Sequence, residues 1–372
     1  MIGFTKDKAK EVLNKFDIDI LIVSSPVNVF YSSGLPTLHV SQNPILYVLN
    51  NHFPNLCLIR KDGEESLFHW MVYQSVNKTS WITDTHGNVS AKMAMNQIKD
   101  KIIEWNYQNG KIGVESIMPK YQLEFLKNNF PNAQFVDGDK AILEMRLIKT
   151  EEEIRRIKQS TKIAEKTITK MIESSYEGIE DYELLKIARR TIIDEGAEGW
   201  DHLTMNLGGS DPEAPGFGYK VRAGEINRFD IGAVLQGYVS DISRHMCIGK
   251  LPEGAKELID WLIQVQEFCE KNIKPNIFPK SVLEEAKKFS KTISKFGRPL
   301  ITCHSIGLEC EEVELFSPTG VYESEFKENM VVDIEIWSNF KNFGLVGVED
   351  CYVIKNHGCE RISSLDKNIF II

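Results

Sequence analysis

The first third of the chain alternates short apolar runs with longer segments in which apolar residues recur every three or four positions. The segment 91–108 has the helical period. The short runs have the length and composition of buried strands: 19–25 (DILIVSS), 44–49 (PILYVL), 56–60 (LCLIR) and 111–116 (KIGVES). Strands and helices that alternate in this way predict an α/β domain. This part of the sequence shows no grouping of residues typical of a catalytic site.

A second pattern begins near residue 146, where a long amphipathic helix is predicted. Thr150, followed three residues later by Glu153, forms the capping box that starts a helix. Apolar residues then recur on one helical face: Ile154, Ile157, Ala164, Ile168, Met171 and Ile172. We therefore place a domain boundary here, with a first domain over residues 1–145 and a second over residues 146–372.

The second domain groups its helices and strands instead of alternating them. Helical spacing recurs over 181–195, 256–272 and 282–296, and Gly196 and Gly297 are the expected ends of the first and last of these helices. Strand-like segments lie between and after them. Grouped elements of both kinds predict the α+β class.

Two aspartates lie inside the first strand pair of this domain. RFDIGAV and YVSDISR alternate in polarity on either side of a turn at Gln236-Gly237, as the strands of a hairpin do. A hairpin centred between Leu235 and Gln236 places Asp230 directly opposite Asp241. Facing Cβ atoms are roughly 4.5–5.5 Å apart, so two ionised carboxylates at these positions require a positive charge between them.

A second strand pair, nearer the carboxyl terminus, repeats the arrangement. VVDIEIW and GVEDCYV flank the residues KNF, and symmetry about Asn342 places Glu335 opposite Glu349. Between the two hairpins, the segment TCHSIGLECEE offers His304, with Gly307 close behind it. Four carboxylates and one imidazole form an oxygen-rich set suited to two divalent ions of the manganese, iron, cobalt or zinc kind.

Each of these features is weak by itself. A single acidic pair in a hairpin is more often a solvated turn, and a single histidine beside glycine is more often structural. What distinguishes them is their joint order along the chain: Asp-x10-Asp, then His-x-x-Gly, then Glu-x13-Glu.

Composition and charge argue against several other classes of function. With 372 residues, 42% of them hydrophobic, the chain can form two cores. Its 44 basic and 53 acidic residues give a formal net charge of −9 without a long block of like charge, so neither a nucleic-acid nor a membrane partner is indicated. The amino terminus lacks an apolar signal core, so we expect a cytoplasmic protein. The seven cysteines contain no C-x-x-C pair, which argues against a disulfide framework or a zinc knuckle.

The order of the five candidate ligands resembles that of the pita-bread metallopeptidases, the superfamily of aminopeptidase P, prolidase, methionine aminopeptidase and creatinase. FDIGAVLQGYVSDISR is similar to the first metal hairpin of this family, HSIGLE to its histidine segment, and VVDIEIW and VGVEDCYVI to its two glutamate strands. VNVFYSSG and EMRLIKTEEEI resemble the start of its noncatalytic domain and the entry to its catalytic domain. The resemblance implies an α/β creatinase-type domain, a pita-bread catalytic domain and a homodimer acting on a short peptide or another small molecule.

The resemblance also implies a role for each candidate ligand. Asp241 and Glu349 would bridge two metal ions, with Asp230 on one ion and His304 and Glu335 on the other.

Several positions depart from the family pattern. Glu213 is the nearest match to a substrate-contacting histidine, and Glu311-Glu312 stands in place of a His-Glu pair. Trp337 replaces the glycine of a Glu-Pro-Gly segment, and Gly347 replaces an arginine. Because these changes remove hydrogen-bond donors and add carboxylates, we expect Glu213, Glu311 and Glu312 to line a pocket that prefers an ammonium, guanidinium or amidine group.

Three functions remain open at this point. The first is a dinuclear-metal hydrolase similar to Xaa-Pro dipeptidases and aminopeptidases, with a changed substrate. The second is a metal-dependent enzyme acting on a small non-peptide molecule, by C–N hydrolysis as in creatinase-type relatives or by elimination. The third is a non-catalytic binding module, which the retention of five ionisable residues in a sheet disfavours.

His245 lies roughly 13 Å along the strand from Asp241, too far to bind the same ion.

Overall fold

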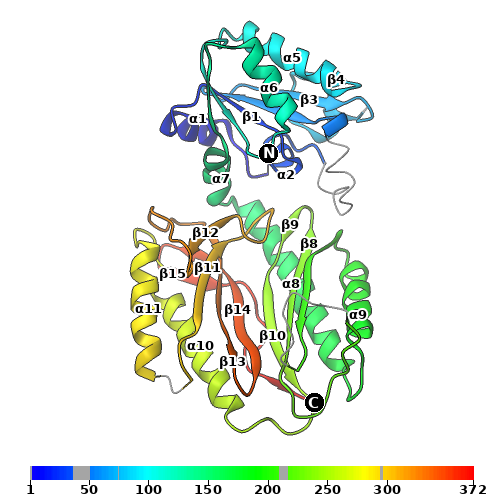
Figure 1. The fold of residues 1–372 in the computed structure, drawn as a ribbon, viewed down its shortest axis with the longest axis vertical. Coiled ribbons are helices and arrows are strands. Elements are labelled where there is room, and N and C mark those ends of the chain that lie inside the picture. Colours follow the sequence, from blue (N-terminus) through cyan, green and yellow to red (C-terminus); the bar gives the residue numbers. More distant parts are fainter. Residues whose placement is uncertain (1, 37–50, 74, 209–216, 294–295) are drawn as a thin grey trace. The chain divides into compact units, whose positions relative to one another are not determined.

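The chain forms two compact units in a computed structural model that describes residues 2–36, 51–73, 75–208, 217–293 and 296–372. The division falls between Arg146 and Leu147 (Figure 1). In the described part of the chain, no helix has both the length and the apolar character needed to cross a membrane.

The first unit is built on a six-stranded mixed sheet in the order β4-β3-β2-β1-β5-β6. The strands are β1 (Ile20–Val23), β2 (Leu56–Arg60), β3 (Glu65–Trp70), β4 (Thr85–Asn88), β5 (Lys111–Val114) and β6 (Gln134–Asp137). The helices are α1 (Lys6–Lys15), α2 (Pro26–Ser33), α4 (Val76–Thr79), α5 (Ala91–Glu104), α6 (Lys120–Asn129) and α7 (Asp139–Leu147). The predictions of β1, β2, β5 and α5 are confirmed, whereas the strand predicted at 44–49 lies outside the described residues.

The second unit contains a ten-stranded sheet with the main order β12-β11-β13-β14-β10-β8-β7, to which β15, β16 and β9 are added beside β14, β10 and β8. Its strands are β7 (Gly199–Asn206), β8 (Asn227–Leu235), β9 (Tyr238–Val239), β10 (Ile242–Cys247), β11 (Leu300–Ser305), β12 (Val313–Phe316), β13 (Val331–Phe340), β14 (Gly344–Lys355), β15 (Gly358–Arg361) and β16 (Phe370–Ile371). Its helices are α8 (Glu151–Glu173), α9 (Asp181–Asp194), α10 (Ala255–Asn272) and α11 (Pro279–Ile293).

The long helix α8 begins where the sequence predicted it. Glu153 N–H donates to Thr150 Oγ1 at 3.3 Å, and Thr150 N–H donates to Glu153 Oε2 at 2.7 Å, so the predicted capping box is confirmed. The buried face of α8 joins α9 and strands β7, β8 and β10 in one apolar cluster, while α10 and α11 form a second cluster with β11, β13 and β14 (Figure 1).

Alternation along the strands separates these cores from the opposite face of the sheet. Phe229 and Ile231 of β8 belong to the cluster with α8, and Ile334 and Ile336 of β13 belong to the cluster with α10. Because successive side chains of a strand point to opposite faces, the residues between them point away from the helices. The candidate site lies on that second face.

Candidate metal centre

A row of polar side chains crosses six neighbouring strands on the face of the sheet opposite the helices. Directly paired residues point to the same face, so each pairing adds a member to the row. From β7 to β11 the members are Thr204, Asp230, Ser243, Glu349, Glu335 and Thr302. Three of the five predicted ligands therefore lie in one line, and the predicted pairing of Glu335 with Glu349 is confirmed.

The predicted register of the first hairpin is wrong by two residues. Asp230 pairs with Ser243, not with Asp241. The turn has two residues, Gln236 (φ 51°) and Gly237 (φ 81°), and the positive φ at both is the conformation that two-residue hairpins favour. The hairpin is thus centred between Gln236 and Gly237. Because a shift of two residues keeps each side chain on its original face, Asp241 still points toward the site.

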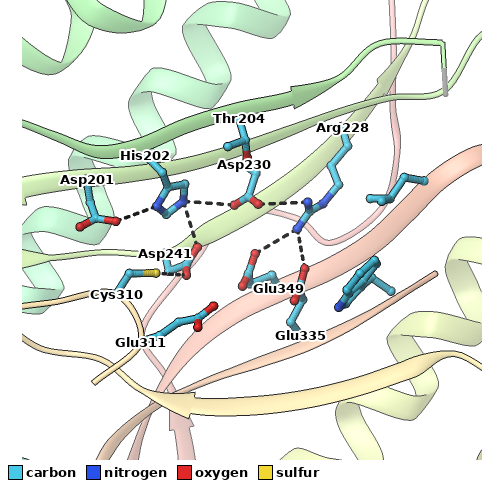
Figure 2. Close-up of a pocket in the computed structure, with 12 residues that line it drawn as sticks. Asp201, His202, Thr204, Arg228, Asp230, Asp241, Cys310, Glu311, Glu335 and Glu349 are labelled. Carbon is cyan, nitrogen blue, oxygen red and sulfur yellow. Dashed lines mark hydrogen bonds and ion pairs between the residues drawn. The ribbon is translucent and has the colours of Figure 1, made fainter. Parts of the chain in front are cut away.

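Arg228 places a positive charge among the predicted ligands. Its Nη1 lies 3.0 Å from Asp230 Oδ2, and its Nη2 lies 2.8 Å from Glu335 Oε1 and 3.2 Å from Glu349 Oε2 (Figure 2). The residue is 2% exposed. It precedes Asp230 by two positions on β8, so strand alternation directs both side chains to the same face. Arg228 was not among the residues predicted from the sequence, although its spacing from Asp230 could have revealed it.

A second basic side chain, His202, bridges the two aspartates. Its Nε2 lies 3.3 Å from Asp230 Oδ1 and 3.3 Å from Asp241 Oδ1, and its Nδ1 lies 3.1 Å from Asp201 Oδ2 (Figure 2). Burial lowers the pKa of His202, but the attraction of Asp241 and hydrogen bonds to the three carboxylates outweigh it and raise the pKa well above its usual value. Gly232 leaves room for the ring, since a Cβ there would lie 2.5 Å from it.

His304 is oriented for metal binding by its own backbone contact. Its Nδ1 lies 3.0 Å from the carbonyl oxygen of Cys310, which can only accept, so Nδ1 carries a proton and, in the neutral form of the ring, Nε2 keeps its lone pair. That atom lies 3.9 Å from Asp241 Oδ2 and 3.9 Å from Glu349 Oε1. Ligand atoms of these three buried residues lie within 4.8 Å of one another, which suits a divalent ion.

Burial and neighbouring charges disfavour the ionised form of two glutamates of the site. Burial, followed by the charges of neighbouring carboxylates, raises the pKa of Glu335 to about 7 in spite of Arg228, and raises the pKa of Glu349 well above its usual value. Binding of a cation should lower the pKa of both glutamates, because it favours the ionised form of each group.

A cavity of about 390 Å³ opens onto this cluster. Trp337 and Leu345 add apolar surface to a lining that is otherwise mostly polar. The lining residues are Asp201, His202, Thr204, Arg228, Asp230, Asp241, Cys310, Glu311, Glu335, Trp337, Leu345 and Glu349.

The three glutamates predicted to contact a substrate have different positions. Glu311 lines the cavity (Figure 2). Glu312 does not line it. Its Oε2 lies 2.8 Å from Lys149 Nζ, and its Oε1 accepts from Leu308 N–H at 2.8 Å. This buried carboxylate therefore links Lys149 to the backbone at Leu308. Glu213 lies outside the described residues.

Two further positions discussed from the sequence have structural explanations. His245 is fully buried, and its Nε2 accepts from Gly347 N–H at 3.2 Å. Burial, with the charges of Arg228 and Arg244, lowers the pKa of His245 to about 3, so it is neutral. Gly347 pairs directly with Trp337, and a Cβ at Gly347 would lie 2.4 Å from Trp337 Cβ. The glycine at position 347 therefore leaves room for Trp337.

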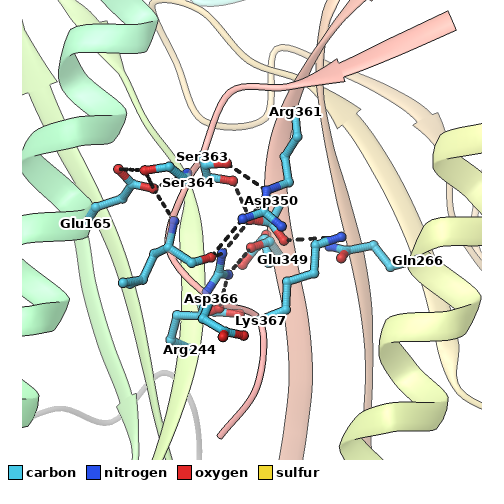
Figure 3. Close-up of polar contacts among 12 residues, drawn as sticks. Glu165, Arg244, Gln266, Glu349, Asp350, Arg361, Ser363, Ser364, Asp366 and Lys367 are labelled. Carbon is cyan, nitrogen blue, oxygen red and sulfur yellow. Dashed lines mark hydrogen bonds and ion pairs between the residues drawn. The ribbon is translucent and has the colours of Figure 1, made fainter. Parts of the chain in front are cut away.

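The strand β14 that carries Glu349 is fixed from its other face. Asp350, the next residue, accepts from Arg244 Nη2 at 2.5 Å and from the hydroxyl of Ser363, and both Asp350 and Arg244 are fully buried (Figure 3). Arg244 also donates to the carbonyl oxygen of Glu349 at 2.9 Å. This network holds the backbone at Glu349 in place while its carboxylate faces the site.

Comparison with known proteins gives two family matches that together span most of the chain. Residues 6–148 match the creatinase/prolidase N-terminal domain, and residues 155–356 match metallopeptidase family M24. A Xaa-Pro dipeptidase of Pyrococcus furiosus is 24% identical over 372 residues, covering 98% of each chain. A Xaa-Pro dipeptidase of Pyrococcus horikoshii is 28% identical over 265 residues, covering 69% of this chain and 74% of the relative.

Solved structures agree on the fold. The prolidase from Pyrococcus horikoshii OT3 superposes with a TM-score of 0.80 at 24% identity, over 97% of this chain and 98% of that one. The Xaa-Pro dipeptidase from Bacillus anthracis gives a TM-score of 0.82 at 19% identity, over 99% of each chain. The predicted fold class, an α/β creatinase-type domain followed by a pita-bread domain and α+β as a whole, is confirmed.

Proposed function

Because the chain belongs to metallopeptidase family M24, we propose that it is a metal-dependent hydrolase similar to Xaa-Pro peptidases, with an altered substrate pocket. The observation that carries the proposal is the convergence of Asp241 and Glu349 on the Nε2 atom of His304. A carboxylate pair and an imidazole whose other nitrogen is held by a carbonyl are a suitable ligand set for a divalent ion such as manganese, iron, cobalt or zinc.

The metal ligands are drawn from the five residues that the sequence indicated, Asp230, Asp241, His304, Glu335 and Glu349, of which Asp241, His304 and Glu349 converge. A divalent ion held there supplies Lewis-acid chemistry for the hydrolysis of an amide or related C–N bond. The protein's own groups supply orientation. Asp201, His202 and Asp241 lie at the same end of the cavity (Figure 2), where Nε2 of His202 is 3.3 Å from Asp230 and from Asp241 and its raised pKa favours the charged form.

The cavity suggests how the substrate differs from an ordinary dipeptide. Glu311 and Asp201 give one end negative charge, and a carboxylate can accept hydrogen bonds from a cationic group but cannot donate one to a peptide carbonyl. Trp337 stands beside Gly347, where the family pattern has an arginine. We therefore propose a substrate with a cationic group bound at Glu311 and an apolar part near Trp337.

A second candidate follows from the same carboxylate. A small cationic molecule that is not a peptide, cleaved at a C–N bond as in creatinase-type relatives or converted by elimination, fits a cavity that has lost the donors for a peptide terminus. Glu311 favours this alternative. Both candidates need the same metal ligands; they differ in the substrate and, for an elimination, also in the reaction. The homodimer and the cytoplasmic location remain predictions from the sequence.

Substrate panels test the proposal directly. The manganese-loaded protein is assayed against Xaa-Pro dipeptides and against small amides and amidines that carry an ammonium or guanidinium group. We expect turnover of a cationic substrate, and we expect Glu311→Gln to reduce its kcat/KM by roughly ten- to a hundredfold, the value of one charge-assisted hydrogen bond. Asp241→Ala should abolish turnover of every substrate.

Glu311→Gln also provides a matched control, because it keeps the size of the side chain and should leave the metal content unchanged. A wild-type kcat/KM of about 10⁴ M⁻¹s⁻¹ or more on Xaa-Pro dipeptides, an ordinary value for an enzyme on its own substrate, would show that the altered-substrate proposal is wrong. Activity that persists in Asp241→Ala would contradict the metal-dependent mechanism.

A further inference from the structure

The guanidinium of Arg228 occupies a position that the family pattern gives to metal ions. It contacts one oxygen from each of three carboxylates: Oδ2 of Asp230, Oε1 of Glu335 and Oε2 of Glu349. These distances, 2.8–3.2 Å, are those of charge-assisted hydrogen bonds. An arginine side chain does not lose its proton in proteins, so this positive charge is permanent.

The position of Arg228 in the sheet explains why the guanidinium lies in the cluster. The residue lies on β8, between β7 and β10, and pairs directly with Asn206 and His245, both buried. Strand alternation starts its side chain on the same face as Asp230. The side chain is 3% exposed, and Figure 2 shows the guanidinium directed toward the carboxylates.

The ligand atoms that remain free of Arg228 lie together on the other side of the cluster. Asp241 Oδ2, Glu349 Oε1 and His304 Nε2 converge there. Glu335, by contrast, has one oxygen on Arg228 and the other 3.3 Å from the hydroxyl of Thr302. An ion bridging Asp230 and Glu349 would lie against the guanidinium, and two like charges at that separation repel each other in a buried site.

We infer that Arg228 replaces one of the two ions that the family pattern implies, so that this chain binds a single divalent ion at Asp241, His304 and Glu349. The inference rests on the proposed function, since it concerns the same site. Part of the positive charge that these carboxylates require is then supplied by the chain itself.

Metal stoichiometry tests the inference without any activity measurement. The purified protein is stripped with chelator, saturated with Mn²⁺, freed of unbound metal and analysed by elemental analysis and electron paramagnetic resonance. We expect one ion per chain and the spectrum of an isolated Mn²⁺ ion. Arg228→Leu should bind two ions per chain and show the spectrum of an exchange-coupled pair. Arg228→Lys, which keeps the positive charge, should bind one.

Two control variants locate the effect. Arg222→Leu makes the same chemical change at an exposed position, where 72% of the side chain is accessible, and should leave the content at one ion. His304→Ala should lose the ion. If Arg228→Leu does not fold, the wild-type spectrum decides by itself, because a coupled pair overturns the inference.

The outcomes separate this inference from the proposed function. Two ions in the wild type overturn the inference and leave a metal-dependent hydrolase intact. A single ion in well-folded Arg228→Leu also overturns it, since removal of the arginine would then open no second site. A wild type that binds no ion under these conditions overturns both.

Discussion

Buried acidic residues of this chain are stabilised in different ways, and the differences have measurable consequences. Glu312 is paired with Lys149 at 2.8 Å, and both side chains are almost inaccessible. Glu65 on β3 is 7% exposed and accepts a hydrogen bond from Trp81 Nε1 at 3.3 Å. Burial of Glu65 outweighs this neutral donor and raises the pKa of its carboxyl group to about 7.

The raised pKa of Glu65 predicts a loss of stability as the pH rises. The folded state holds the proton more tightly than the unfolded state, in which the pKa is near 4.5. Its contribution is therefore complete below about pH 4.5 and is lost as the pH rises through 7, by up to about 3 kcal/mol. Urea unfolding between pH 5 and 8 should show that Glu65→Gln, which stays neutral, lacks this part of the pH dependence. Identical pH profiles of wild type and variant would contradict the prediction.

Single residues of the site were predictable only where their backbone is regular. Arg228 follows from the alternation of β8, because it lies two positions before Asp230. His202 does not, since the pairing of β7 with β8 shifts between Trp200 and His202. This irregularity lets the neighbours Asp201 and His202 both line the cavity, against the alternation of a regular strand.

At the scale of strands, β14 links the metal site to the core by presenting Glu349 and Asp350 to opposite faces of the sheet. Glu349 faces the cavity, while Asp350 is fully buried against Arg244 behind it. An ion pair of this kind contributes little beyond a well-packed apolar pair, but removing one partner leaves an uncompensated charge. The strand therefore depends on Asp350 more than its distance from the cavity suggests.

We predict that Asp350→Ala destabilises the second unit by about 3–5 kcal/mol, because Arg244 then remains buried without a counter-charge. The matched control is Asp260→Ala, which breaks the pair of Lys256 with Asp260 on the surface of α10 and should change stability by about 0–1 kcal/mol. Denaturant unfolding of the two variants compares them directly. A similar small effect in both would mean that Arg244 finds other acceptors at no cost.

The elements themselves were largely predictable, and the errors are instructive. The capping box at Thr150 fixed the start of α8 because it depends on residues three positions apart. The pairing of Glu335 with Glu349 was correct because the hairpin is symmetric about Asn342. The first hairpin was misplaced by two residues, since the positive φ of Gln236 that sets its turn is not evident from the residue type. Each side chain of this hairpin was still predicted on the correct face of the sheet, because the error in register is an even number of residues.

At the scale of the molecule, the described site residues belong to the second unit, Leu147–Ile372, and the Glu65 environment belongs to the first, Met1–Arg146. Ligand linkage stabilises the unit that binds the ligand. Metal should thus stabilise the second unit alone, while titration of Glu65 acts on the first, which makes the two units distinguishable in one unfolding experiment.

We therefore predict that saturation with Mn²⁺ raises the melting temperature of the second unit alone. A free ion concentration of one hundred times the Kd adds about 2.7 kcal/mol, which corresponds to roughly 5–10 °C for a domain of this size. Calorimetry should show this increase in wild type, its reversal by chelator and its absence in Asp241→Ala. The melting transition of the first unit, identified as the one that Glu65→Gln shifts, should not respond to the metal. A melting profile that chelator leaves unchanged, after confirmed removal of the metal, would contradict a folded-state ion at Asp241, His304 and Glu349, because binding to the folded state alone must appear as stability.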